Sequence, residues 1–151
     1  MDIIKTLQDY EKAGLLFHGS PKKLDVIEPK KPFDSVRSGG FNNDTALFAT
    51  PHVVIAVAFA CVDVGIINRS DRQKFGTKYG VYFVKDVAEL RIPSYFKNYF
   101  NRFNGYVYVI GEKPNDNNWQ VKLYKPHKPL DCIYVNIGLF ECLGGRTVWL
   151  G

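Results

Sequence analysis

A histidine, a glycine and a hydroxyl follow directly on a short apolar run near the start of the chain. The run is residues 15–17, and His18, Gly19 and Ser20 come next. An imidazole can donate one hydrogen bond while its other nitrogen is held by the main chain, and glycine lets a ligand approach the backbone closely. The pattern therefore predicts a pocket for a polar ligand at the end of a buried strand. A structural histidine is the alternative for this motif taken alone.

A second segment joins a strand to a helix. Residues 46–49 have the character of a strand, and Thr50 followed by Pro51 predicts a helix start, with a hydroxyl N-cap and proline at the first helical position. The helix is expected to run to about Val64 and to stop at Gly65. Its apolar residues go nearly all round, which is typical of a helix buried between layers.

Side chains of this second segment suit a planar ligand. Leu47 or Phe48 can cover a ring, and Phe59 can stack on one. Ala56, Phe59 and Ala60 share one face of the expected helix, where small residues allow a close approach to a sheet. Ordinary packing of the helix on the sheet is the alternative interpretation.

A third segment carries an amide that can reach a ligand. If residues 119–124 form a strand, Gln120, Lys122 and Tyr124 share the face opposite the apolar side chains. Gln120 then points away from the apolar side, where its amide can bond a ligand hydroxyl. A solvent-facing amide is the alternative.

The remaining patterns predict an α+β fold in a single domain, residues 1–151, with two or three helices and about six or seven strands. We expect an amphipathic helix over residues 2–13 and a basic loop over 68–79. The aromatic stripe in residues 94–103 has helical spacing and indicates core or lid rather than a nucleic-acid platform. Most strands come late, in the runs GVYFVKD, GYVYVIGE, WQVKLY, DCIYVNI and TVWLG.

Composition narrows the classes of function. The net charge of +5 and the pI near 9.1 suit a nucleotide, nucleic-acid or acidic protein partner, and they suit plain solubility equally well. No apolar run approaches the roughly 20 residues that span a bilayer, and the N-terminus lacks a signal-peptide pattern, so we expect no membrane partner. The 3 cysteines lack metal-type spacing, which favours buried thiols in a reducing cytoplasm.

Taken in order, the motifs resemble those of one family. HGSP after a strand, an LFAT strand leading into an A-x-x-F-A helix, and a late GYVYVI…W-x-V…KPHKPLDCIYV segment look like the ADP-ribosyltransferase superfamily. The similarity is to its diphtheria-toxin and poly(ADP-ribose)-polymerase-like branch and covers about residues 15–138. It implies that family's split β-sheet core, NAD as substrate, and mono-ADP-ribosyl transfer to a protein or nucleic-acid target, as in toxins and effectors.

The resemblance also implies roles for individual residues. His18 would hold a ribose of NAD, Gly19 would pair with the nicotinamide carboxamide through its backbone, and Phe48 or Phe59 would stack on nicotinamide. The family prefers tyrosine at the second-strand position, so the stacking is kept here and the hydroxyl is lost. The implied catalytic residues are His18, Phe48 and Gln120, and the implied NAD-binding residues are His18, Gly19, Ser20, Arg37, Phe48, Thr50 and Phe59, with Arg37 at the pyrophosphate.

Alternatives to this function stay open. Gln120 supplies no charge to a cationic ribose, so an NAD- or ADP-ribose-binding module without catalysis is one. The RNA 2′-phosphotransferase branch of the superfamily is another, because basic residues can hold RNA phosphate. Those residues are Lys22, Lys23, Arg69, Arg72 and Lys74. A basic nucleic-acid-binding or protein-binding domain without an NAD site is the alternative from another class.

Overall fold

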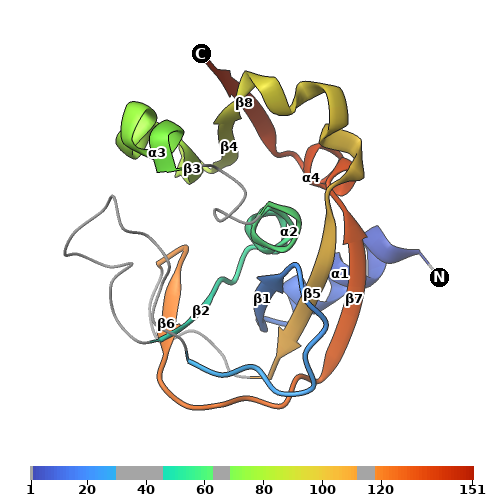
Figure 1. Ribbon diagram of the computed structural model, residues 1–151. Helices are drawn as coiled ribbons and strands as arrows, with labels where there is room; N and C mark the ends of the chain where they lie inside the picture. The colour runs from blue at the N-terminus through green and yellow to red at the C-terminus, as the bar shows by residue number, and fades with distance from the viewer. Residues whose placement is uncertain (1, 30–45, 63–68, 112–117) are drawn as a thin grey trace.

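The computed structural model describes residues 2–29, 46–62, 69–111 and 118–151, and helix α2 lies at its centre (Figure 1). The helices are α1 (Ile3–Lys12), α2 (Val53–Cys61), α3 (Arg69–Phe75) and α4 (Gly138–Cys142), with the 3-10 helices η3 (Gly76–Lys78) and η4 (Ser94–Arg102). The strands are β1 (Leu16–Ser20), β2 (Leu47–Ala49), β3 (Gly80–Val84), β4 (Val87–Pro93), β5 (Asn104–Ile110), β6 (Val121–Leu123), β7 (Asp131–Asn136) and β8 (Arg146–Leu150). The predicted α+β class is confirmed.

Three small sheets contain these strands. β1, β5 and β7 form an antiparallel sheet in the order β1-β5-β7. β3, β4 and β8 form a second sheet, in which β8 runs parallel to β4, and β2 pairs antiparallel with β6. Figure 1 shows α2 between the two three-stranded sheets, and α2 contacts strands of both. Its position explains why it is apolar all round, and seven of its nine residues are buried.

Two glycines let α2 lie very close to the first sheet. A β-carbon on Gly19 of β1 would overlap the carbonyl oxygen of Ala56 and lie 2.5 Å from the amide nitrogen of Ala60. A β-carbon on Gly105 of β5 would overlap the carbonyl of Ala60. Both glycines are therefore required by the approach of main chain to main chain, whatever else they do.

The β1-β5-β7 sheet has two different faces because side chains alternate along each strand. The inner face packs with α2 in the main core and carries Phe17, Val107, Val109, Ile133 and Val135. The outer face contributes Leu16, Tyr108 and Ile110 to a smaller core with residues of β2 and β6. By the same alternation His18, Ser20, Tyr106 and Tyr134 belong to the outer face.

The start of α2 differs from the prediction. The helix begins at Val53, after His52 as N-cap, and not at Thr50 and Pro51. The His52 side chain makes no cap bond. The carboxylate of Glu11 instead accepts the Val53 N–H at 2.7 Å. A partner from α1 has thus replaced the local hydroxyl cap, because the Thr50 hydroxyl is used elsewhere.

The sequence also predicted other helices and strands incorrectly. α2 ends at Cys61, earlier than expected, and residues 63–68 lie outside the described residues. The predicted basic loop 68–79 contains α3 and η3, since Arg, Gln and Lys favour helix even without an apolar stripe. β4 and α4 were not predicted, so the described residues already hold more helices than the two or three expected. The aromatic stripe at 94–103 is helical, as η4.

A buried carboxylate joins β4 to β8. Glu89 is 5% exposed, and its two oxygens accept from Arg91 Nε at 2.6 Å and from the Arg146 guanidinium. Arg146 and Arg91 hold the pKa of Glu89 below its ordinary value of 4.5, against the opposing effect of burial. The Arg91 guanidinium also lies 4.1 Å from the centre of the Tyr82 ring. These ion pairs link β8, the parallel strand at the edge of the sheet, to β4.

The three thiols lie in different surroundings, although the sequence predicted buried ones. Cys61 is buried, Cys132 is half-buried and Cys142 is exposed. Burial raises the pKa of the Cys61 thiol to about 12. No group of three or more potential metal ligands is found among the described residues. In the same part of the chain, the helices are too short or too polar to cross a membrane.

Candidate functional site

Beyond Phe17, the edge of β1 that faces away from β5 is open as far as the described residues go, and the main chain of Gly19 lies on it. Phe17 and Thr50 exchange two backbone hydrogen bonds of 2.8 Å, and Val109, opposite Phe17, turns its carbonyl to the Leu130 N–H on the other side. Phe17 and Val109 therefore form a non-hydrogen-bonded pair of the ladder. Alternation along β1 then directs the N–H and C=O of Gly19 to the same open edge, one step beyond Thr50.

His18 is held in place by β2. Its Nδ1 lies 2.7 Å from the carbonyl oxygen of Phe48. Because a carbonyl only accepts, Nδ1 carries a proton and donates it to the Phe48 carbonyl. The imidazole centre lies 6.3 Å from the ring centre of Tyr108. The main chain thus fixes one nitrogen of His18, as the motif predicts.

Thr50 links the second motif to the third. Its side-chain hydroxyl donates to the carbonyl of Trp119 at 2.5 Å and accepts from the His52 N–H at 3.1 Å. Thr50 is only 2% exposed, and its backbone is paired with β1. Its polar groups therefore connect three segments that are far apart in the sequence.

The pairing of β2 with β6 brings Gln120 to the same place. Ala49 lies opposite Val121, so the residue before Val121 is next to the end of β2. Gln120 is half-buried and precedes β6, which is shorter than the predicted strand over 119–124. We name residues 17–20, 48–50 and 119–120 together the strand-edge site.

An aromatic group borders the strand-edge site and was not found from the sequence. The His52 and Phe83 rings stack with centres 4.5 Å apart, and the Trp119 ring lies 6.5 Å from Phe83. All three residues are half-buried. They come from three segments that are far apart in the sequence, so no local pattern indicates their contact. Phe83 belongs to β3, which means that the second three-stranded sheet also contributes to the surroundings of the site.

The strand-edge site contains the amide of Gln120 at the position where a carboxylate would stabilise a cationic ribose. Its described residues include no Asp or Glu, and Gln120 is the polar side chain of the third segment. Glu11 binds the first N–H of α2, and Asp131 accepts from the Tyr10 hydroxyl at 2.8 Å. Glu89 is held by two arginines in another sheet. These carboxylates have structural partners of their own.

The structure describes fewer contacts for the remaining residues that the resemblance implies for NAD binding. The Ser20 hydroxyl accepts from the Lys22 N–H at 3.2 Å, which shapes the turn after β1. Phe48 is half-buried, and Phe59 packs against the main core from α2. Arg37 lies outside the described residues, so its role at a pyrophosphate stays a prediction.

Tyr108 folds the segment after β1 back over the outer face. Its hydroxyl donates to the Lys22 carbonyl at 2.7 Å and accepts from the Leu24 N–H at 2.5 Å. Burial raises the pKa of Tyr108 to about 12, so the hydroxyl stays protonated at neutral pH. The lysine-rich turn is therefore fixed beside the histidine of the strand-edge site.

No family model, curated protein or solved structure matches this chain.

Proposed function

We propose that this protein binds NAD at the strand-edge site and transfers ADP-ribose to a macromolecular acceptor. The observation that carries the proposal is the junction of three distant motifs by hydrogen bonds. Phe17 pairs with Thr50, His18 bonds the Phe48 carbonyl, and Thr50 bonds the Trp119 carbonyl. A structural role for each motif alone would not require all three to meet at one sheet edge.

The main chain at this edge fits a carboxamide. A primary amide presents one donor and one acceptor side by side, and Gly19 directs one N–H and one C=O to the open edge. This complementarity supports nicotinamide as the group bound there. The imidazole of His18 then contacts the adjoining ribose, and the Phe48 ring covers the planar base.

The reaction breaks the bond between ribose C1′ and the nicotinamide nitrogen. The bonding electron pair leaves with nicotinamide, C1′ gains positive charge, and a lone pair of the acceptor forms the new bond while the acceptor loses a proton. The Gln120 carbonyl oxygen can accept from a ribose hydroxyl but brings no full negative charge. Because electrostatic stabilisation usually dominates such steps, we expect slow transfer.

NAD or ADP-ribose binding without transfer is the second candidate function. It is favoured because Gln120 carries no charge and because Glu11, Glu89 and Asp131 are already bound to other groups of the fold. The two candidates share a binding site and differ only in the release of nicotinamide.

Thermal unfolding with and without millimolar NAD tests the shared site. NAD present at 100 times its dissociation constant should add about 2.7 kcal/mol, or a rise in Tm of roughly 5–11 °C for a chain of this size. The rise should disappear in His18→Ala and persist in His127→Ala, a matched loss of an imidazole outside the site. Chromatographic detection of free nicotinamide then separates transfer or hydrolysis from binding alone.

Three outcomes decide the matter. A shift that requires His18, with nicotinamide release, supports the transferase. The same shift without release, with candidate protein and oligonucleotide acceptors supplied, favours the binding module. No shift in the unsubstituted protein, or an equal loss in both histidine variants, rejects an NAD site at this edge.

A further inference from the structure

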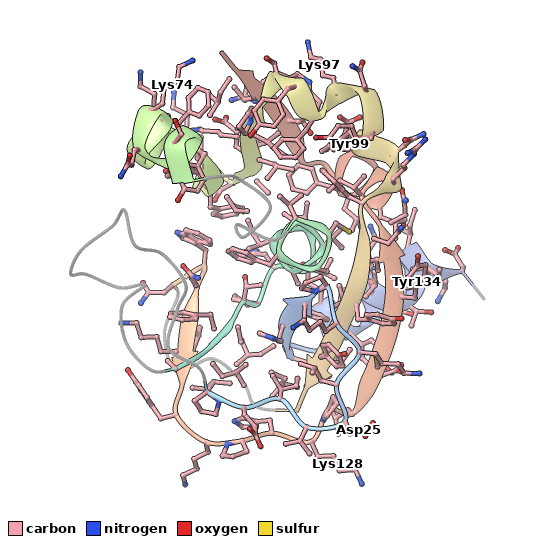
Figure 2. All side chains as sticks on the ribbon, viewed as in Figure 1. Asp25, Lys74, Lys97, Tyr99, Lys128 and Tyr134 are labelled. Carbon is pink, nitrogen blue, oxygen red and sulfur yellow. The ribbon has the colours of Figure 1, made fainter. Side chains whose placement is uncertain are left out.

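One end of the outer sheet face combines exposed Tyr134 and half-buried Tyr106 with cations. Ser20, Tyr106 and Tyr134 form one row across β1, β5 and β7, since each is the register partner of the next. The Tyr106 and Tyr134 rings meet edge to face, with centres 5.4 Å apart. Tyr134 is 54% exposed, and Figure 2 shows it on the side of β7 away from α2.

Two lysines lie at the β1 end of this row. Lys22 and Lys23 are exposed and belong to the turn after Ser20, which Tyr108 holds over the same face. Residues 16–24, 102–110 and 132–138 carry no carboxylate at all. We name Lys22, Lys23, Tyr106 and Tyr134 the tyrosine face.

We propose that the tyrosine face binds single-stranded nucleic acid. A base has a flat face that stacks on an exposed aromatic ring, whatever its sequence, while Lys and Arg neutralise the adjoining phosphates. Both parts are present here, with the tyrosines in one row of the sheet and the lysines in the turn that follows β1, on a chain of net charge +5. An acidic peptide would use the cations but has no need of the tyrosine row.

The location joins this surface to the strand-edge site. His18 and Ser20 lie on the same outer face of β1, one side-chain position apart. A strand bound over Tyr106 therefore passes close to His18. That this strand is also the ADP-ribose acceptor rests on the proposed function, whereas binding is measured without NAD, so the failure of one is distinguishable from failure of the other.

Fluorescence anisotropy with labelled 12-mers of dT and of U tests the binding at low salt. Tyr134→Ala should weaken binding about 5- to 150-fold, the range for loss of one stacked base, and Tyr134→Phe should restore it. Tyr95→Ala is the matched control, because Tyr95 is 44% exposed but lies on η4. Preference for one 12-mer over the other tells whether DNA or RNA is the natural strand.

Salt dependence tests the cations separately. Replacing Lys22 and Lys23 with Ala should reduce the slope of log affinity against log salt by about 1.4, near 0.7 for each lost phosphate contact. Replacing Lys74 and Lys97 with Ala changes the net charge equally, and these exposed lysines lie at the other end of the molecule (Figure 2). That control should leave the slope nearly unchanged.

Several results would overturn the inference. One is no binding of either 12-mer by the unsubstituted protein in low salt. Another is an equal effect of the Tyr134→Ala and Tyr95→Ala changes, or of the two lysine pairs. Binding of poly-glutamate that depends on Tyr134 to the same degree would point to an acidic protein partner instead.

Discussion

Gly19→Ala provides the sharpest test of how α2 is seated on the first sheet. The added methyl group would overlap the Ala56 carbonyl oxygen and lie 2.5 Å from the Ala60 nitrogen. Both atoms belong to the main chain of a buried helix, so no side-chain rotation relieves the overlap. Overpacking of a core typically costs 1–3 kcal/mol, and we expect about 3 kcal/mol here. For a chain of this size, that is a fall in Tm of roughly 6–12 °C.

Urea and thermal unfolding of three variants measure this cost. Gly105→Ala should be similarly destabilised, because its methyl group would overlap the Ala60 carbonyl and lie 3.0 Å from the Ser20 oxygen. Gly111→Ala is the matched control. Among the described residues, the atoms nearest to its methyl group belong to the Leu130 side chain, at 3.1 Å, and Leu130 is 66% exposed. We expect a change within about 0.5 kcal/mol for this variant.

The comparison also separates the two roles of the HGS motif. The free energy of unfolding of Gly19→Ala can also fall within about 1 kcal/mol of the value for the unsubstituted protein. In that case α2 does not approach the sheet as closely as described, and its position is wrong. Gly105 is on the middle strand and has no access to the open edge of β1. A loss of NAD-induced stabilisation in Gly19→Ala alone, beyond the loss in Gly105→Ala, would indicate a binding role for Gly19 in addition to packing.

The remaining predictions concern charge, thiol reactivity and catalysis. Glu89→Gln should lower stability at pH 7 by about 1–2 kcal/mol, since Arg146 loses a charged partner. The lowered pKa of Glu89 stabilises the fold above pH 4.5, and this contribution falls as pH drops through the folded-state pKa, so urea unfolding of the variant should depend less on pH in that range. Iodoacetamide at pH 8, followed by mass spectrometry, should modify exposed Cys142 well before Cys61, and equal rates would contradict the burial of Cys61. Gln120→Glu should speed nicotinamide release about 100-fold if Gln120 faces the ribose, whereas an unchanged rate would remove Gln120 from the proposed mechanism.

Local patterns in the sequence were sufficient for most elements near the site. The amphipathic helix at 2–13 forms as α1, and the strand runs around residues 16, 47 and 133 form as β1, β2 and β7. These elements are specified by periodic side chains within a few residues of each other, so their signal is complete in one short window. The all-round apolar character of α2 likewise predicted its burial.

Local sequence patterns did not predict the contacts between residues that are distant in the chain. Thr50 has the best local chemistry for a helix cap, yet its hydroxyl bonds Trp119 and Glu11 caps the helix instead. The stacking of His52 on Phe83 has no counterpart in sequence spacing. The choice among hydrogen-bond partners depends on which groups the packing of the sheets brings within 3 Å, and the chain order does not contain that distance.

The sequence by itself determined the chemical components: an imidazole, a glycine and a hydroxyl after a buried strand, an amide in a late one, and an excess of cations. Only the tertiary structure decided that these components meet. Pairing of Phe17 with Thr50 places Gly19 at an open edge, and α2 against the inner face requires that residue to be glycine. The physical reason is that a sheet edge and a sheet face are defined by neighbouring strands, which local sequence does not specify.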